Sequence, residues 1–492
     1  MLFLISLCAL VLLAIHRCRR ATRTIVSKVR GPPATTWYGP ALDFMEKQVG
    51  EADFPWLEEY GSVVRLRVPL TLGFGDILLI SDPKALRHMH QTAFKDFGAN
   101  ALRHAVMDLM TGPGIGTAQG LQHVRQQRVI QPGFAVADIK AQIPKFSNFA
   151  IKLVDKWSAL IAADSGTSTI IDVTEWNIKF TLCCMGVAVL DYEFGALDGK
   201  DDPLMEAVET MGTMLKGGVI SMSISKLVPP WVYQLVFDYS WSEKIRRMRY
   251  ARELCTTFAE RLVEEKTVAL KEGRQRKDTM TFLFAANSTL AHTMHWLLYE
   301  LARHPEYQRR LKDDVRGKQP QSTNLDSLPF LNAFVKEILR MHPVAFMVTQ
   351  VPKVDTVLPL SQPITLTTGE VINQLPIPKG QNIMLKSIWG EDAHVFNPDR
   401  WLREDMQAKS SGFGMYSSLG TFLGGPKGCI GWRMAVVVLQ VYAFEVASKF
   451  KFSQTEDTKK VRRHTSVFML PKIDGKLERG ICLPLVVELD DD

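Results

Sequence analysis

Several features that define other protein classes are missing from this 492-residue sequence. Its seven cysteines form no disulfide framework, because Cys183 and Cys184 are adjacent and the others are scattered. It contains no C-x-x-C pair, which argues against a structural zinc site. It also has no internal repeat and no dense aromatic-basic segment, and its net charge of +7 is spread along the chain. These absences argue against a disulfide scaffold and against nucleic acid as a partner.

A short apolar segment is present at residues 2–15, and the basic sequence His-Arg-Cys-Arg-Arg follows it directly. A cleaved signal peptide is the simplest alternative, but it would carry its charges before the apolar run and end in a small-residue cleavage site. We therefore expect residues 1–20 to be a retained membrane anchor. The run is shorter than the ~20 residues of an ordinary spanning helix, so a tilted span and an interfacial anchor are both open. The positive-inside rule places the basic residues in the cytosol.

Proline and glycine are concentrated after the anchor, at Gly31-Pro32-Pro33 and Gly39-Pro40, which predicts a basic, stiff hinge over residues 21–40. Residues 41–492 predict one large domain, mainly α with a minor antiparallel β part. Apolar periodicity predicts helices at 139–163, 174–190, 203–215, 242–271, 279–303 and 329–341, and alternation predicts strands at 63–68, 76–80, 344–351, 356–358, 364–368, 371–375 and 484–489. Residues 100–119 read as a loop because of their glycine and proline breakers.

One stretch stands out near the C-terminus, where residues 421–431 read Thr-Phe-Leu-Gly-Gly-Pro-Lys-Gly-Cys-Ile-Gly before an apolar helical run. Glycine lets backbone approach a large flat ligand closely, because it has no side chain and tolerates unusual dihedral angles. Backbone N–H groups of the loop and of the following helix can stabilise a thiolate. The pattern therefore predicts that Cys429 presents its sulfur to the metal of a cofactor.

Three other spacings accompany this loop. Ser288 and Thr289 lie in the middle of the helix predicted at 279–303, which is apolar nearly all round and therefore buried. Polar residues there are costly unless they serve a purpose, although a helical threonine commonly bonds to its own helix backbone. Glu337 and Arg340 share one face of a helix, and Arg400 follows in a polar loop.

In chain order these motifs are Ala-Ala-x-Ser-Thr, Glu-x-x-Arg, Pro-x-Arg-Trp and Phe-x-x-Gly-x-Lys-x-Cys-x-Gly. The chain thereby resembles the cytochrome P-450 superfamily of haem-thiolate monooxygenases, microsomal type, and residues 387–393 resemble fungal members in particular. The resemblance covers nearly the whole chain. It implies the cytochrome P-450 fold, in which residues 41–492 form a single large helical domain around a buried haem b.

By this resemblance, Cys429 is the axial thiolate on the haem iron, and its electron donation favours O–O cleavage. Phe422 is expected to pack beside the ring and the sulfur, while Gly425 and Gly431 permit close approach. Thr289 is expected to hold the water network at the oxygen site. A second set, behind the cysteine loop, resembles the buried ion triad of the family and consists of Glu337, Arg340 and Arg400.

The expected haem-propionate shell departs from the family pattern. Lys427 stands where the family usually has arginine, which keeps the charge and loses the bidentate fork. His123 takes the place of a tryptophan and remains a plausible donor. Gln127 and Gln350 fall where many members have arginines, so the shell is expected to be less charged than usual.

Two neighbouring arginines, Arg125 and Arg128, are candidates to supply the missing charge. On the oxygen side, Ser288 replaces the acid that relays protons in the family. A serine passes protons through water but cannot store one as a general acid. We therefore expect another residue or a water chain to deliver the proton.

The substrate is expected to be a small apolar molecule of terpenoid, polyketide or indole type. By analogy the pocket is formed by residues 100–119, 205–233, 344–349 and 466–470, in which no charged anchor for a substrate carboxylate stands out. These pieces are rich in methionine, namely Met107, Met110, Met211, Met214, Met222, Met347 and Met469. Methionine more often fills core space than recognises a ligand.

The resemblance predicts a monooxygenase of secondary metabolism, anchored in the endoplasmic reticulum membrane with its catalytic domain in the cytosol. It would use O2 and electrons from an NADPH-dependent flavoprotein reductase, because this chain has no flavin domain. The reductase is expected to dock near Lys427 and Arg433. Two alternatives stay open. One is a haem-thiolate isomerase or dehydratase that does not consume NADPH, and the other is a non-catalytic haem-binding membrane protein, which would not need Thr289.

Overall fold

The computed structural model describes residues 24–69, 75–112, 114–164, 166–200, 203–207, 229–267, 278–385, 392–403, 414–466 and 468–490. The anchor expected at residues 1–20 lies outside these ranges. So does most of the helix expected at 203–215, together with Met211, Met214 and Met222.

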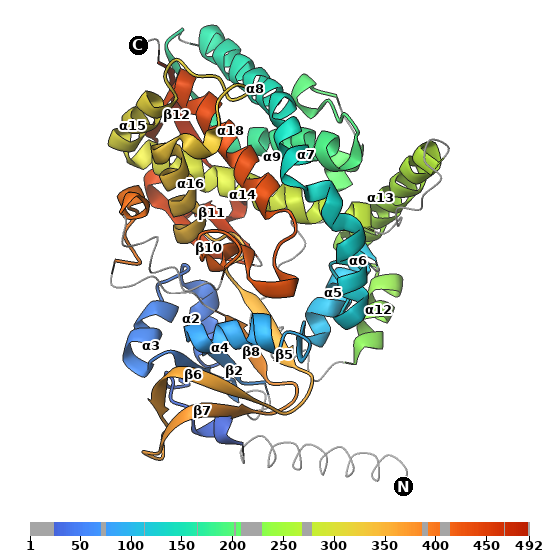
Figure 1. Cartoon of the computed structure of the whole chain (residues 1–492), viewed down its shortest axis with the longest axis vertical. Coiled ribbons are helices and arrows are strands. Elements are labelled where there is room, and N and C mark those ends of the chain that lie inside the picture. Colours follow the sequence, from blue (N-terminus) through green and yellow to red (C-terminus); the bar gives the residue numbers. More distant parts are fainter. Residues whose placement is uncertain are drawn as a thin grey trace.

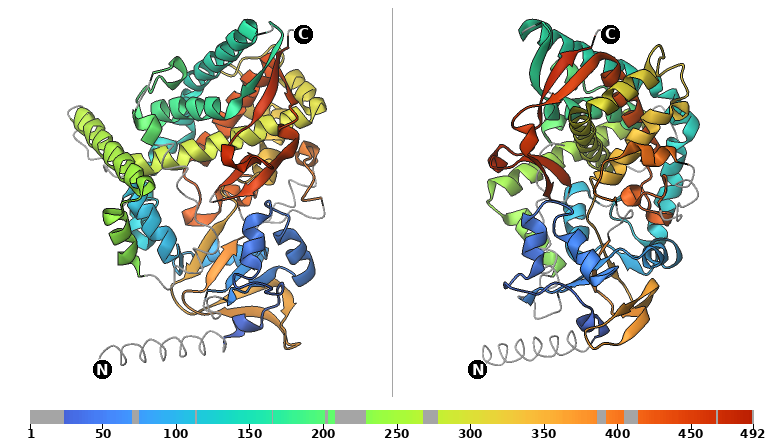
Figure 2. Two further views of the ribbon diagram at one scale, coloured as in Figure 1. Left: turned by 180° about the vertical axis from the view of Figure 1, so that it is seen from behind. Right: turned by 90° about the vertical axis from the view of Figure 1, so that its left-hand side faces the viewer.

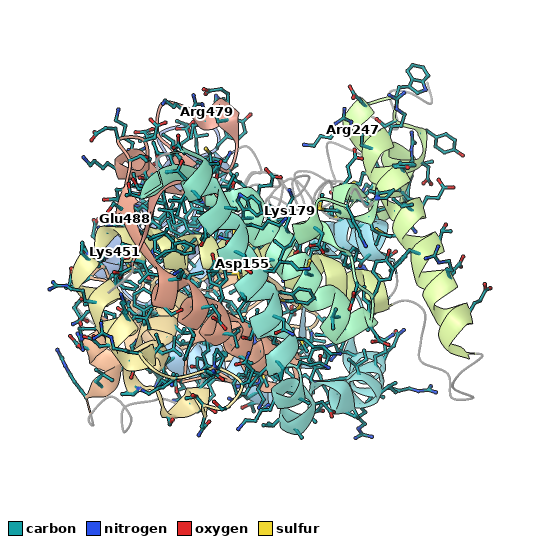
Figure 3. The ribbon with its side chains drawn as sticks, turned by 90° about the horizontal axis from the view of Figure 1, so that it is seen from above. Asp155, Lys179, Arg247, Lys451, Arg479 and Glu488 are labelled. Atoms are coloured by element: carbon teal, nitrogen blue, oxygen red, sulfur yellow. The ribbon has the colours of Figure 1, made fainter. Side chains whose placement is uncertain are left out.

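Helices make up the larger part of the molecule, and a smaller part rich in strands lies against it (Figure 1). The main helices are α2 (Pro40–Glu46), α3 (Asp53–Tyr60), α4 (Pro83–Arg87), α5 (Ala101–Thr111), α6 (Gly120–Ile130), α7 (Val136–Ala141), α8 (Ile143–Asp164), α9 (Val173–Met185), α12 (Pro230–Tyr239), α13 (Glu243–Thr267), α14 (Asp278–Arg303), α15 (Pro305–Val315), α16 (Pro329–Met341) and α18 (Trp432–Lys449). Charged side chains such as Asp155 and Arg247 project from this helical surface (Figure 3).

The strands are β1 (Val63–Leu66), β2 (Ile77–Ile80), β3 (Phe97–Gly98), β4 (Ser168–Asp172), β5 (Val348–Pro352), β6 (Thr356–Thr365), β7 (Val371–Ile377), β8 (Asn382–Leu385), β9 (Phe450–Gln454), β10 (Val461–Thr465), β11 (Met469–Ile473) and β12 (Pro484–Leu489). They form one sheet in the order β1-β2-β8-β5-β3, a second in the order β4-β12-β9, and the pairs β6-β7 and β10-β11. The mainly α fold with small sheets is thus confirmed.

The expectation of a purely antiparallel β part is wrong for one pair. Strands β2 and β8 run parallel, with Ile77 opposite Asn382, while every other pairing between described strands is antiparallel. Parallel neighbours need a long crossover connection. Here nearly the whole helical part of the chain lies between the two strands, so the crossover is available.

Residues 101–111 are a helix, α5, although a loop was predicted there. The Asn100 side chain caps this helix, since its Oδ1 accepts a hydrogen bond of 2.8 Å from the Arg103 backbone N–H. The breakers follow later, and Gly112, with φ +70°, ends the helix. The helix positions Arg103 and Met107 on the wall of a cavity described below.

Helix α14 passes through the middle of the helical part in both further views (Figure 2). From Leu290 to Leu301 its apolar side chains are nearly all buried, against α9, α16, α18 and β9. Within the described residues, one helical stretch, Val173–Leu190, is long and apolar enough to cross a bilayer, but 67% of it is buried inside the protein. It is therefore a core helix here, and α14 lies against it.

Candidate active site

The cysteine loop is held in place by its own backbone and by α16. The Cys429 N–H donates to the carbonyl of Phe422 at 2.9 Å, and the Thr421 hydroxyl donates to the carbonyl of Leu339 at 2.6 Å. Burial raises the pKa of the Cys429 thiol, while a hydrogen bond involving the Gly431 backbone lowers it. Cys429 nevertheless has exposed surface, because the loop opens onto an internal cavity.

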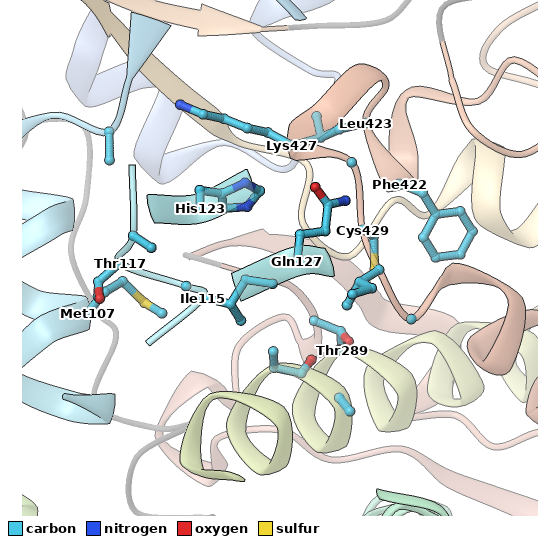
Figure 4. Close-up of a pocket in the computed structure, with 18 of the residues that line it drawn as sticks. Met107, Ile115, Thr117, His123, Gln127, Thr289, Phe422, Leu423, Lys427 and Cys429 are labelled. Carbon is cyan, nitrogen blue, oxygen red and sulfur yellow. Dashed lines mark hydrogen bonds between the residues drawn. The ribbon is translucent and has the colours of Figure 1, made fainter. Parts of the chain in front are cut away.

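This cavity has a volume of about 420 Å³ and lies between the cysteine loop, α5, α6, α14 and β5. Cys429 and Thr289 lie on facing sides of it, and His123 and Gln127 of α6 form a third side (Figure 4). Its apolar lining includes Met107, Ile115, Met185, Val189, Leu290 and Val348. The cavity can therefore hold a large, mostly apolar group between a sulfur and a hydroxyl.

On α14, the two residues predicted to be catalytic point in different directions. Thr289 lines the cavity, and its hydroxyl donates to the carbonyl of Ala285 at 2.7 Å, which is the ordinary bond of a helical threonine. Ser288 is 8% exposed and is not part of the described lining. Asn287, next to it, accepts a 2.6 Å hydrogen bond from the Thr181 hydroxyl of α9. Among the side chains of α14 that the structure describes, Thr289 is thus the hydroxyl that lines the cavity.

The polar residues predicted around a propionate-bearing edge do meet at the cavity. His123, Gln127, Gln350 and Lys427 all line it. The Nδ1 atom of His123 and the Oε1 atom of Gln350 are buried and have no hydrogen-bond partner in the part of the chain that the structure describes. The ammonium of Lys427 donates to the carbonyl of Phe97 at 2.8 Å. Two unpartnered buried polar atoms indicate a site built for a polar ligand group.

The loop glycines have different surroundings. Gly431 lines the cavity, and a Cβ there would meet only Phe134, at 3.7 Å. Gly425 is not among the described lining residues. Its φ is +68°, and a Cβ there would lie 2.1 Å from the carbonyl oxygen of His90. Gly425 is therefore required by contact between two backbone segments, and its expected part in the approach of a ligand stays a prediction.

The predicted ion triad is present behind the cysteine loop. Glu337 is fully buried and accepts hydrogen bonds from Arg340 at 2.8 Å, from Arg400 at 3.1 Å and from the Trp401 ring at 2.9 Å. The backbone N–H of Asn397 adds another bond at 2.7 Å. A buried carboxylate with this many donors has its charge compensated, and it joins α16 to the segment before the loop.

Sequence reasoning missed a charged residue of the cavity, Arg103 of α5. Its guanidinium donates to the carbonyl of Thr349 at 3.4 Å. Because the stretch was read as a loop, no position on it could be assigned to a wall. The asparagine at position 100 was the available signal, since it is a preferred helix N-cap. The sequence analysis found no charged anchor for a substrate carboxylate in residues 100–119, and Arg103 is a charged residue of that segment that lines the cavity.

Of the described methionines named in the sequence analysis, more lie in or against the hydrophobic core than on the wall of the cavity. Met107 lines the cavity, whereas Met110 and Met469 are buried in the core. Met347 also packs against that core and is not among the described lining residues. In the described part of the chain, the lining methionines are therefore Met107, Met185 and Met434, two of which sequence reasoning did not name.

A cysteine that faces a helical hydroxyl across a cavity of this size is the site of a protein that holds a cofactor by a thiolate. Comparison with known proteins identifies which one. Residues 29–479 match the family model described as cytochrome P450. The chain therefore belongs to the cytochrome P450 family, whose members bind haem through a cysteine thiolate and incorporate oxygen from O2.

The most similar curated relatives include fungal monooxygenases. Cytochrome P450 monooxygenase 219 of Postia placenta is 28% identical, with 87% of this chain and 88% of the relative covered. Monooxygenase 205 of the same fungus is 26% identical over 94% and 92% of the two chains. Ganoderic acid synthetase of Ganoderma lucidum is 26% identical over 93% of each. The family, the fungal likeness and the monooxygenase class predicted from the motifs are confirmed.

Proposed function

We propose that this chain is a membrane-associated monooxygenase that hydroxylates or epoxidises a small apolar molecule in secondary metabolism. The observation that carries the proposal is the cavity with Cys429 on one side and Thr289 on the other. Its lining is largely apolar, which suits an apolar substrate. A relative named for a secondary metabolite, ganoderic acid synthetase, supports this direction without identifying the substrate.

The residues around the cavity fit haem. Cys429 offers a sulfur with open surface, and Phe422 and Gly431 line the cavity beside it. His123 supplies a buried ring nitrogen that has no hydrogen-bond partner among the described residues. When bound, haem supplies the activation of O2. In this proposal Cys429 holds the iron, and the two flanking residues shape the space next to the sulfur. His123 and Lys427 contact the polar edge.

On the oxygen side, Thr289 is proposed to hold a water at the cavity through its hydroxyl, which can accept a hydrogen bond while it donates to Ala285. Ser288 is proposed to pass protons through water in place of the usual acid. It is buried beside Thr289 and shares its helix face with His292, four residues on, so a relay from that face has polar groups to follow.

Electrons are proposed to come from an NADPH-dependent flavoprotein reductase, docking where Arg433 lies beside the cysteine loop. The Arg433 guanidinium stacks on the Trp432 ring with 4.2 Å between the charge and the ring centroid. The anchor at residues 1–20 and a location in the endoplasmic reticulum membrane complete the proposal.

The function is tested with purified protein, a reductase, NADPH and labelled O2. Label in the product, dependent on NADPH, is the expected result. Product formed without NADPH would instead indicate an isomerase or dehydratase, and the absence of turnover with any binding ligand would indicate a haem carrier.

The cysteine assignment has its own test. We expect Cys429→Ala to lose the red-shifted thiolate band of the reduced carbon-monoxide complex, because the ligand atom is gone. Cys482→Ala is the matched control, since Cys482 is a cysteine that does not line the cavity, and it should keep the band. Survival of the band in Cys429→Ala would refute the assignment.

A further inference from the structure

Neutral side chains occupy the positions where many relatives of this fold were expected to carry arginine. Gln127 and Gln350 line the cavity and bring no charge to it. The two arginines that were expected to compensate do not reach it. Arg125 and Arg128 lie on α6 with exposed side chains, and neither is part of the described lining. Charge for an anionic ligand must therefore come from elsewhere.

Three cations gather along β5 instead. Arg103 of α5 bonds to the carbonyl of Thr349 in this strand. Lys353 directly follows the strand, and its backbone N–H donates to the carbonyl of Asp96 at 2.7 Å. Lys427 bonds to the carbonyl of Phe97, the residue that pairs with Pro352 of β5. Side chains from three distant segments thus converge beside Gln350.

The electrostatics of this cluster are unfavourable without a ligand. Lys427 lies close to two other cations, Lys353 and Arg103. Burial lowers the pKa of Arg103. Among the described residues, no carboxylate acts on either group. Like charges surrounded by protein without a counter-charge are costly, so the arrangement indicates a site for an anion.

Gly98 has no side chain, which leaves room for the side chains of Gln119 and Lys353 beside this cluster. A Cβ at Gly98 would lie 2.8 Å from the Gln119 amide oxygen and 2.9 Å from Cε of Lys353. Gly98 itself lines the cavity, and its φ is not in the left-handed region. The glycine therefore leaves room for the ends of two flexible side chains, and Cε of Lys353 lies against a residue that lines the cavity.

The surface of Arg103 shows where the anion would lie. Protein surrounds this side chain closely enough to lower its pKa, yet part of the residue's surface is exposed. Both facts hold because its free surface faces the cavity that it lines. A guanidinium directed into a cavity can bind a carboxylate through two parallel hydrogen bonds, which an ammonium cannot do.

We propose that Arg103, assisted by Lys353 and Lys427, binds the propionate carboxylates of haem, in place of arginines at positions 127 and 350. This inference rests on the proposed function, because it requires haem to occupy the cavity with Cys429 on its iron. It places the main propionate contact on α5, the same helix that presents Met107 to the cavity.

The same chemistry could serve a carboxylate on the substrate. The propionates are favoured, because Lys427 lies only two residues from Cys429, in the loop that would hold the iron. Within the described ranges, Gln350 and His123 beside the cluster also have buried polar atoms without a hydrogen-bond partner. The two sources of carboxylate are separated by changing the haem and leaving the protein in its natural membrane-bound form.

The experiment combines a variant with a modified cofactor. The full-length protein and Arg103→Gln are each reconstituted with haem and with haem dimethyl ester, whose propionate charges are removed. The rate of transfer to apomyoglobin is then measured for the four combinations. Arg125→Gln is the matched control, because it removes an arginine of similar exposure that does not line the cavity.

We expect the natural protein to release the ester at least about tenfold faster than haem, since a charged hydrogen bond is lost. In Arg103→Gln, haem should be released about tenfold faster while the ester is released at nearly the same rate as from the natural protein. Arg125→Gln should release both forms as the natural protein does. Equal acceleration of haem and ester in Arg103→Gln would overturn the proposal, because it would indicate lost packing.

A rescue variant guards against general misfolding. Adding Gln350→Arg to Arg103→Gln should restore slow haem release, because it returns charge to the same edge. Unchanged haem release in Arg103→Gln would overturn the proposal, because Arg103 would then not hold the propionates. Throughout, the thiolate band of the reduced carbon-monoxide complex must persist in these variants. Its loss in the natural protein would refute the proposed function, a result separate from any effect of Arg103.

Discussion

At the scale of single residues, the cysteine loop depends on one glycine for contact between backbones. Gly425 lies against the His90 carbonyl in a left-handed conformation, so any side chain there meets both dihedral strain and a clash. The loop that carries Cys429 is positioned by that contact. Its sulfur therefore depends on a residue that lies outside the cavity lining.

We expect Gly425→Ala to lower the free energy of unfolding by about 3 kcal/mol or more and to reduce haem content, because a clash adds to the dihedral cost. Gly317→Ala is the control. Gly317 has φ +71° with nothing within 4 Å of its Cβ position, so it should show only the dihedral cost of about 1–2 kcal/mol. Thermal unfolding and haem content per chain are the measurements, and equal effects of the two substitutions would contradict the clash.

At residue level, the motifs predicted which side chains come together, while the roles assigned to them stay predictions. Cys429, Thr289 and the triad were placed by their spacing, and the structure brings the first two to one cavity. The position of Arg103 at the cavity could not be predicted from the sequence, because it depends on where α5 packs and not on a motif. The reason for Gly425 was also out of reach, because its partner, His90, is more than 300 residues away.

At the scale of elements, α16 is fastened to the segment before the cysteine loop by one carboxylate. Glu337 collects donors from Arg340, Arg400, Trp401 and the backbone of Asn397. Arg400 also bonds to Asp392 at 2.8 Å, but that side chain is 49% exposed. Glu337 and Asp392 therefore share Arg400 as a partner, but Glu337 is buried and Asp392 is exposed.

We expect Glu337→Gln to cost about 3–5 kcal/mol of unfolding free energy, since it leaves the buried Arg340 without its counter-charge and the buried Arg400 with only the half-exposed Asp392. Asp392→Asn should cost less than about 1 kcal/mol, because the Asp392 carboxylate is 49% exposed and is screened by solvent, and Arg400 keeps Glu337. Denaturant unfolding of the two variants side by side measures the difference. A small effect of Glu337→Gln would show that the arginines find other acceptors.

Elements with strong periodicity were predictable from sequence. The helix at 329–341 and the strand at 484–489 have the predicted bounds. The predicted helix at 139–163 is divided, because α7 ends at Ala141 and α8 begins at Ile143. The parallel pairing of β2 with β8 could not be predicted, since no local pattern encodes a contact across the whole helical part.

At the scale of the whole molecule, α14, α16 and the following segments are joined by a buried network around Glu300. His342 donates to Glu300 at 2.7 Å and stacks on Trp296, with ring centroids 4.4 Å apart. Burial would raise the pKa of Glu300, but hydrogen bonds from His304 and His342 outweigh it and lower the pKa to about 2. The folded protein therefore stabilises the ionised carboxylate of Glu300.

A folded-state pKa below the ordinary value of 4.5 means that stability is full above pH 4.5 and is lost as pH falls toward 2. We expect this group to contribute about 3 kcal/mol to that acid limb. Glu300→Gln should lower stability at pH 7 and flatten the limb, whereas Glu306→Gln, at an exposed position, should do neither. Unfolding free energies between pH 3 and pH 7 test this, and an unchanged slope in Glu300→Gln would contradict it.

Helix α5 carries Arg103 near its start and Met107 one turn later, so one rigid element meets both the cofactor edge and the substrate space. If haem binds as proposed, a newly synthesised chain without it keeps three like charges close together along β5, and haem is the counter-ion that stabilises the fold. In a cell short of haem, we therefore expect not a pool of inactive enzyme but a short-lived chain that is removed by proteases.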